Sequence, residues 1–243
     1  MRLSRSALTL LFVSILLLPA AQVRADGSTV MLEQRLVDWL FLNPLASYAP
    51  ESDYGPFVYV DSKGKPLGLS VDFLHLISQK TGLRILAQPA APLSLNLEKA
   101  KQKRVDILTS LRPTPERGEF LQFTTPYVSI PAALFLPTGK DSNTTLAEMS
   151  GRRLAVGKGY AVEHFLRENF KQIQWVAVAS DAEGMQQMAA GKVDGVVADI
   201  ASVHFLSTQA NAYQSVQAAN VGFEYPLSFA FRKDKPELGE ILQ

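Results

Sequence analysis

Short apolar, β-like runs alternate with amphipathic segments along this chain, and this alternation constrains its fold more than any other feature. Residues 57–60 and 66–69 flank a turn that contains Gly64, which predicts a β-hairpin. Residues 70–81 carry apolar side chains at helical spacing and stop before Gly82, as a helix does at its C-terminus. The pattern continues with a strand, a helix and a strand at 83–86, 95–103 and 105–109. Such alternation predicts an α/β fold.

A polar break at 137–143 separates this set from a second α/β set. Ser180 is followed three residues later by Glu183, a capping-box spacing that predicts a helix start. A final strand at 227–231 comes late enough to return to the first set, which predicts a two-strand hinge. Strands of the second set are expected at 153–156, 175–179 and 193–197. We predict one lobe from 26–131 with 227–243, a second lobe from 138–225, and chain crossings at 132–137 and 226–232.

The two sets share a junction in which a helix ends and a Val-Asp pair enters a buried strand, at Asp106 and again at Asp194. The first strand runs into Thr109 and Ser110, and the second runs into Asp199. Ligands of open α/β sheets bind beyond the carboxyl ends of strands. We therefore expect a cleft with one polar edge from each lobe. The alternative is that the shared junction has only a structural role, since a helix followed by Val-Asp and a strand is common in proteins.

The first 25 residues have the features of a secretory signal peptide. Arg2 and Arg5 precede an apolar run from 7 to 18, and small residues at Val23 and Ala25 predict cleavage after Ala25. An uncleaved anchor is the alternative, but the run is shorter than the ~20 residues that span a bilayer. No cysteine follows the run, so a lipoprotein anchor is excluded. We expect a protein of the periplasm.

The charge and cysteine counts exclude several classes of function. Removing residues 1–25 deletes three arginines from the 24 basic residues and none of the 23 acidic ones, which leaves a net charge of −2. A nearly neutral chain without basic runs is a poor nucleic-acid binder. The absence of cysteine excludes disulfides, thiolate metal sites and cysteine nucleophiles. His75, His164 and His204 are far apart, so we expect no metal site and no cofactor.

Particular motifs carry a resemblance to a known family. Asp106 enters a strand, Thr114 begins a Thr-x-x-Arg motif that ends at Arg117, and a Phe-Thr-Thr-Pro-Tyr motif ends at Tyr127. Further matches are Pro56, Phe57, Gly64, Gly68, Asp72, Gly82, Gly151, Gly157, Gly159, Gly191, Asp194, Asp199 and the segment 230–234. In this order they resemble the family 3 extracellular solute-binding proteins, the periplasmic amino-acid-binding type with a "Venus flytrap" fold. Within the family, the sequence is most similar in its motifs to members that are fused to sensor kinases or diguanylate cyclases.

The resemblance implies roles for individual residues. Arg117 falls on the arginine that grips the ligand α-carboxylate, for which a planar guanidinium is well suited. Asp199 falls on the acid that receives the ligand ammonium, and it is equally suited to cap the helix that starts at Ile200. Tyr54 falls on an aromatic over the ligand side chain, with a packed turn tyrosine as the alternative. The remaining implied contacts are Ser110 or Thr109 from the first lobe and the turn of Gly159, Tyr160 and Ala161 at a helix N-terminus, where amides meet anions.

Three departures from the family pattern stand out. The segment 106–114 is one residue short, which puts a direct contact from Ser110 in doubt. Ala161 replaces a hydroxyl residue, so the ligand need not be a standard amino acid. The segment from Trp39 to Tyr54 lacks the compact first strand that is usual in the family.

The implied function is capture of a small amino-acid-like ligand by lobe closure, without catalysis. The partner is either a membrane sensor, of which this is the periplasmic input domain, or an ABC permease. Residues 236–243 are expected to begin a helix with an apolar face at Leu238, Ile241 and Leu242. The given sequence stops inside this helix, which favours the interpretation that it is a fragment of a longer sensor protein. Cyclohexadienyl dehydratases share the fold, so a related enzyme is the alternative, with Glu163 as the candidate acid or base.

Overall fold

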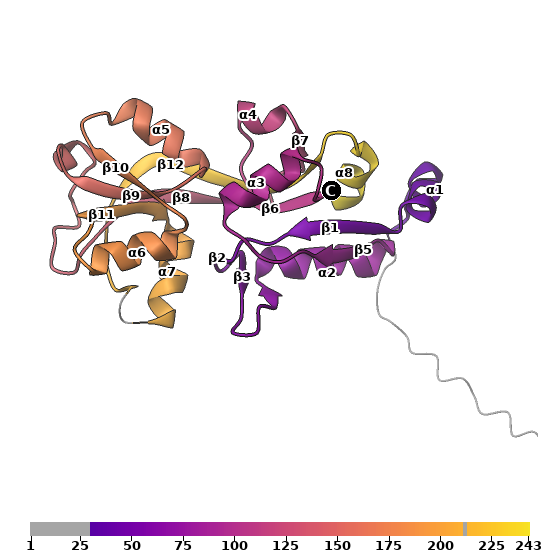
Figure 1. Ribbon diagram of the computed structural model, residues 1–243, viewed down its shortest axis with the longest axis horizontal. Coiled ribbons are helices and arrows are strands. Elements are labelled where there is room, and N and C mark those ends of the chain that lie inside the picture. The colour runs from indigo at the N-terminus through magenta and orange to yellow at the C-terminus, as the bar shows by residue number, and fades with distance from the viewer. Residues whose placement is uncertain (1–29, 211–212) are drawn as a thin grey trace, which may run out of the picture.

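The computed structural model describes residues 30–210 and 213–243, which form two α/β halves lying side by side (Figure 1). The predicted signal peptide lies outside the described residues. The first half contains α1 (Gln34–Leu42), β1 (Leu45–Ala49), β2 (Asp53–Tyr54), β3 (Val58–Val60), β4 (Pro66–Leu67), α2 (Leu69–Thr81), β5 (Arg84–Ala87), α3 (Leu93–Lys101), β6 (Ile107–Leu111), α4 (Pro115–Gly118), β7 (Leu121–Phe123) and α8 (Pro236–Leu242). The second half contains a 3₁₀ turn (Ala147–Met149), β9 (Arg153–Gly157), α5 (Ala161–Asn169), β10 (Gln174–Val178), α6 (Asp181–Ala189), β11 (Gly195–Asp199) and α7 (Ile200–Gln209).

Two long strands, β8 (Val128–Leu136) and β12 (Val216–Arg232), run through both halves and join them (Figure 1). The strand order is β10-β9-β11-β8-β12-β6-β1-β5, with β7 also paired to β12, so hydrogen bonding is continuous from one half to the other. The pairs β9–β10, β9–β11, β1–β5 and β1–β6 are parallel, whereas β8 and β12 run antiparallel to their neighbours. Two parallel α/β sets joined by two antiparallel crossing strands confirm the predicted fold class.

The pairing register favours a particular position for the crossing. Residues 128–131 of β8 pair with 224–227 of β12. From Ala132 onward β8 also pairs with β11, and from Ser228 onward β12 pairs with β6. We therefore propose that the lobes meet at 128–131 and 224–227, slightly before the predicted crossings; the lobe bounds themselves stay a prediction.

Most predicted elements are present, and one prediction was wrong. The hairpin, the helix α2 and the strands of both halves lie within two residues of the predicted bounds, and Gly82 adopts the left-handed conformation that ends α2. The segment 39–54, however, does contain a compact first strand, β1, which pairs with β5 and β6 on its two sides. Its sequence Leu-Ala-Ser-Tyr-Ala has no β-branched residue and so little strand propensity of its own, and the strand depends on its pairing with β5 and β6.

The C-terminal helix closes the core of the first half. Leu238, Ile241 and Leu242 are all buried, which confirms the predicted apolar face of α8. They belong to a cluster that extends from the first half across the crossing strands into the second half. A separate cluster, which includes Phe135, Met185 and Val196, packs α6 and α7 on the other face of the second sheet.

Gly68 is required at the start of α2, and its replacement by alanine tests this. Its φ is +113°, and an added Cβ would lie 2.6 Å from the Phe57 carbonyl oxygen. We expect Gly68→Ala to lower the free energy of unfolding by about 3 kcal/mol, measured by urea denaturation, because a strained backbone and a backbone clash act together. Gly64→Ala is the control: its φ is +76° with open space around it, so only the conformational cost of about 1 kcal/mol is expected. Equal losses in both variants would contradict the clash.

Candidate ligand-binding cleft

A small cavity of about 20 Å³ lies where the two lobes face each other. This cavity by itself holds about one water molecule, and an adjoining open groove of about 800 Å³ shares Arg112, Arg117, Tyr160 and Ala161 with it. Both lobes and the crossing strands contribute to the lining of the cavity. The lining residues are Glu51, Tyr54, Leu93, Ser110, Leu111, Arg112, Arg117, Tyr160, Ala161, Tyr225 and Leu227.

Arg117 reaches from the first lobe to the second. Thr114 caps α4, because its hydroxyl accepts a hydrogen bond from the Arg117 amide at 3.3 Å, and this fixes the turn that carries the guanidinium. The guanidinium donates to the Arg112 carbonyl at 2.5 Å and to the Gly159 carbonyl of the second lobe at 2.7 Å. Only 6% of Arg117 is exposed, and burial lowers its pKa from 12.5 to about 10. Both terminal nitrogens of Arg117 are therefore engaged with backbone carbonyls, and a contact with a ligand carboxylate stays a prediction.

Asp199 lies at the end of β11 in the second lobe and is 1% exposed. Its Oδ1 accepts a hydrogen bond from the Ser202 amide at 2.7 Å, so the helix-capping role is confirmed. Burial raises the pKa of Asp199 from 3.8 to about 6, against the lowering effects of the Ser202 amide and the Tyr54 hydroxyl. Asp199 thus interacts with Tyr54, which lines the cavity, but does not itself belong to the cavity lining.

A buried carboxyl group that sequence reasoning missed also faces the cleft. Glu51 follows β1 and is 5% exposed, and the Tyr160 hydroxyl of the second lobe donates a 2.5 Å hydrogen bond to its Oε1. Burial raises the pKa of Glu51 from 4.5 to about 8, with smaller raising effects from Asp53 and Asp199 and a lowering effect from Arg117. The group is thus neutral at pH 7 and links the two lobes. No motif marked it, because a single glutamate in a Pro-Glu-Ser turn has no distinctive spacing.

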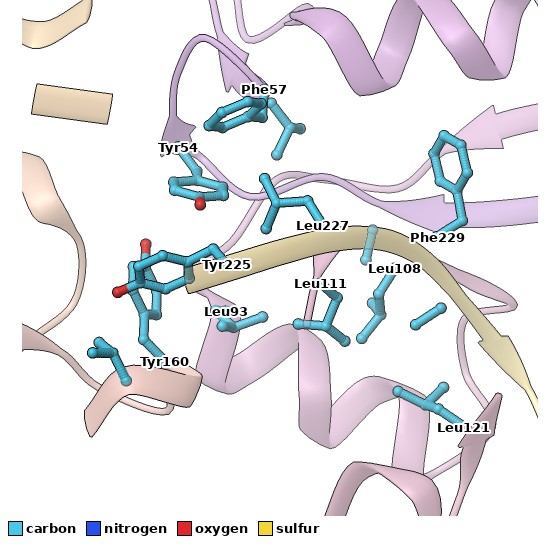
Figure 2. Close-up of a cluster of buried hydrophobic side chains, with 14 of the residues drawn as sticks. Tyr54, Phe57, Leu93, Leu108, Leu111, Leu121, Tyr160, Tyr225, Leu227 and Phe229 are labelled. Atoms are coloured by element: carbon cyan, nitrogen blue, oxygen red, sulfur yellow. The ribbon is translucent and has the colours of Figure 1, made fainter. Parts of the chain in front are cut away.

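Three tyrosines gather at the cleft end of the buried cluster, with Leu93 and Leu227 beyond them (Figure 2). The rings of Tyr54 and Tyr160 meet edge to face with centroids 5.8 Å apart, and Tyr54 also contacts Phe57 at 5.3 Å. The third, Tyr225, comes from β12 and was not predicted, since its strand returns from the far end of the chain. These rings give the cleft aromatic walls, as expected for the side-chain pocket of a small ligand.

The first-lobe hydroxyl residues differ from each other. Ser110 lines the cavity and has a φ of +55°, a strained conformation for a residue with a side chain. Its hydroxyl is already paired with Ser70 at 2.7 Å and with Tyr127 at 3.2 Å. Thr109 is buried, lies outside the lining, and its Oγ1 has no hydrogen-bond partner. A ligand contact from either one stays a prediction.

The second-lobe turn is partly occupied by its own chain. The Gly159 amide donates to Glu163 Oε2 at 2.8 Å, and the Tyr160 amide donates to the Gly157 carbonyl at 3.1 Å. These two amides are therefore engaged, and the predicted anion contact there would need them to exchange partners. Ala161, at the first position of α5, lines the cavity directly.

Metal binding and membrane crossing find no support in the described part of the chain. Within 30–210 and 213–243, no group of three or more His, Asp or Glu side chains is arranged to hold a metal ion. Over the same residues, no helix is long and apolar enough to cross a bilayer.

Comparison with known proteins agrees with this architecture. The profile of the bacterial extracellular solute-binding proteins, family 3, matches residues 47–243. Among curated relatives, the putative ABC transporter arginine-binding protein 2 of Escherichia coli K12 is 27% identical over 64% of this chain and 63% of its own length. The sensor protein EvgS of the same strain is 22% identical over 84% of this chain, which corresponds to 17% of the sensor. The chain thus spans less than two thirds of either relative.

Solved structures show the same fold. The periplasmic domain of BvgS from B. pertussis superposes with a TM-score of 0.79 and 21% identity, over 87% of this chain and 42% of that one. Holo ArgBP from T. maritima gives a TM-score of 0.75 and 20% identity, over 84% and 90% of the two chains. The fold is therefore the two-lobed Venus flytrap of periplasmic binding proteins. Together with the profile match, these findings show that the chain belongs to family 3 of the bacterial extracellular solute-binding proteins.

Proposed function

We propose that this protein captures an amino acid or a similar small carboxylate between its lobes, with Arg117 holding the α-carboxylate and Asp199 receiving the ammonium. The observation that carries this proposal is the position of these two side chains. They are 82 positions apart in the sequence and come from opposite lobes, yet both are buried and both act electrostatically on Glu51, which lines the cavity. Closing the lobes completes the pair of charges around a zwitterion.

We further propose that lobe closure serves as the input of a membrane-embedded sensor. The similarity to EvgS extends over 84% of this chain, whereas that to the arginine-binding relative extends over 64%, which supports the sensor over an ABC permease as partner. Family membership and the predicted signal peptide at 1–25 support a location in the periplasm.

A second candidate is favoured by one observation. An elimination enzyme on this fold needs a general acid in its cleft, and Glu51, protonated below pH 8, is such a group. The predicted candidate, Glu163, is instead engaged with the Gly159 amide and with Arg167 at 2.9 Å. Turnover of cyclohexadienyl acids that is lost in Glu51→Gln would establish the enzyme, and binding of amino acids without turnover would exclude it.

The deciding experiment is a thermal-shift screen of the purified protein against amino acids, opines, polyamines and small carboxylates. A ligand at about 100 times its dissociation constant stabilises the fold by roughly 2.7 kcal/mol, a shift of several degrees. For any compound that shifts the midpoint, small-angle X-ray scattering should show a smaller radius of gyration in its presence. Binding without compaction would contradict capture by closure.

A further inference from the structure

Acidic side chains outnumber basic ones around the cleft, where Arg112 and Arg117 line the cavity. Burial raises the pKa of Glu51 and Asp53 from the first lobe and of Asp181 and Asp199 from the second, and the other three acids raise the pKa of Asp181 further. Arg117 is the buried cation among them. In the proposed complex the ligand carboxylate balances Arg117 and the ligand ammonium balances Asp199. Glu51 is bonded to Tyr160, and Asp53 faces the hydroxyl of Ser180, which leaves Asp181 without a counterpart.

Asp181 is buried without a hydrogen-bond partner. It is 1% exposed, and neither Oδ1 nor Oδ2 has a partner. Burying an unpaired carboxylate is costly, and burial and Asp199 hold the pKa of Asp181 well above its usual range. The unpaired carboxyl of Asp181 therefore does not stabilise the fold, and its presence needs another explanation.

Helix capping does not provide that explanation. Asp181 is the first residue of α6, but the cap is made by its neighbours: Ser180 Oγ accepts from the Glu183 amide at 3.2 Å, and Glu183 Oε2 accepts from the Ala179 amide at 2.6 Å. The Asp181 side chain is therefore free of this task and turns inward.

Two further buried oxygens without a hydrogen-bond partner belong to residues that interact electrostatically with Asp181. Ser202 Oγ is close enough to lower the pKa of Asp181, although neither side chain completes a hydrogen bond of normal geometry. Tyr225 Oη is also buried without a partner, and Asp181 raises its pKa. A carboxylate and two hydroxyls offer acceptors to a cation that has several N–H donors. Because the acids within the described residues are not arranged to hold a metal ion, an extended organic cation suits them better.

We propose that Asp181, with Ser202 and Tyr225, receives a second positive charge of the ligand, an ammonium or guanidinium at the end of its side chain. This inference rests on the proposed capture of an amino acid, and it narrows that ligand to a basic one. Asp181 belongs to the second lobe, so lobe closure brings it onto the side chain of a ligand already held by Arg117.

The test compares basic ligands with neutral ligands of the same shape by isothermal titration calorimetry. L-arginine is paired with L-citrulline, and L-lysine with L-norleucine, on the wild type, Asp181→Asn and the control Asp72→Asn, which changes an exposed carboxylate of α2. We expect the wild type and the control to bind one basic member roughly tenfold or more tighter than its neutral partner. Asp181→Asn should lose this preference while its affinity for the neutral partner stays the same.

Each other outcome is decisive. Equal affinity for both members of each pair, or a preference that survives Asp181→Asn, overturns the second-charge site but leaves amino-acid capture intact. If no amino acid binds, the proposed capture of an amino acid is wrong. Thermal stabilisation by cadaverine then tests the second-charge site at Asp181 by itself. Stabilisation by cadaverine that is lost in Asp181→Asn supports it, and no stabilisation overturns it. Stabilisation by NaCl alone, lost in the same variant, would assign an inorganic cation instead and overturn the proposal.

The unliganded variant provides a further readout. Because Asp181→Asn removes an uncompensated buried carboxyl, its melting temperature at pH 7.5 should equal or exceed that of the wild type. A lower melting temperature would show that the carboxyl serves the fold, which contradicts a group reserved for a ligand.

Discussion

Arg117→Ala is expected to abolish measurable binding of any amino acid that stabilises the wild type. The variant removes a buried guanidinium that faces the second lobe through a 2.7 Å hydrogen bond. Removing one partner of a desolvated charge pair costs about 2–5 kcal/mol, which corresponds to a loss of roughly 30-fold to several thousandfold in affinity. Calorimetric titration of the ligand found by thermal shift measures this loss.

Two control variants separate the role of the guanidinium fork from that of charge and fold. Arg117→Lys keeps the charge but not the planar pair of donors, so its affinity should be intermediate. Arg84→Ala removes an exposed arginine of β5 and should bind like the wild type. Circular dichroism verifies that Arg117→Ala is folded, since Arg117 also bonds to the Arg112 carbonyl. Wild-type affinity in a folded Arg117→Ala would exclude the carboxylate role.

Stability should fall as the pH rises from 5 to 8.5, with contributions from Glu51 and from Asp181, both of which have a raised pKa in the folded protein. The Glu51 carboxyl has a pKa of about 8 in the folded protein against 4.5 as its ordinary value. Between these values the folded protein holds a proton that the unfolded chain has lost, so each pH unit destabilises the fold by up to about 1.4 kcal/mol. Asp199, with a pKa of about 6, adds to the loss at the lower end of this range. Carboxyls with lowered pKa, such as Asp106 and Asp194, act in the opposite direction only below about pH 4.

Glu51→Gln is the matching variant, because an amide imitates the protonated acid. We expect it to equal the wild type in urea denaturation at pH 5 and to exceed it increasingly toward pH 8.5. Glu98→Gln, on the exposed side of α3, should keep the wild-type slope. A wild-type slope in Glu51→Gln would mean that Glu51 does not hold the proton.

The sequence located the two halves of the cleft because its informative residues lie in local motifs. Arg117 lies in a Thr-Pro-Glu-Arg turn, and Asp199 ends a strand before a helix. Each of these patterns can be recognised from a few consecutive residues. The structure places Arg117, Tyr54 and Tyr160 around one buried cavity, and Asp199 interacts with Tyr54 from outside its lining. Whether these residues bind a ligand stays a prediction.

The residues that were missed depend on tertiary contacts. Glu51 acquires its properties from a tyrosine 109 positions away, and Tyr225 reaches the cleft through the long return strand. Asp181 lies inside a capping box formed by Ser180 and Glu183. Because this motif explains the polar residues at the start of α6, nothing in the sequence indicated that the Asp181 carboxyl is buried. The first strand was missed for a similar reason, since its sequence lacks β-branched residues and the strand is held by pairing with β5 and β6.

The path of β12 also sets an order of events for folding. It pairs Phe231 with Ile107 and Ala230 with Leu108, so the sheet of the first half stays unfinished until the end of the chain is available. The elements β9 to α7 of the second half follow one another without interruption by the first. Short loops close at a lower entropic cost than long ones. The second half therefore has the faster route to its native contacts, and during synthesis it can become compact while the earlier-made half still waits for its last strand.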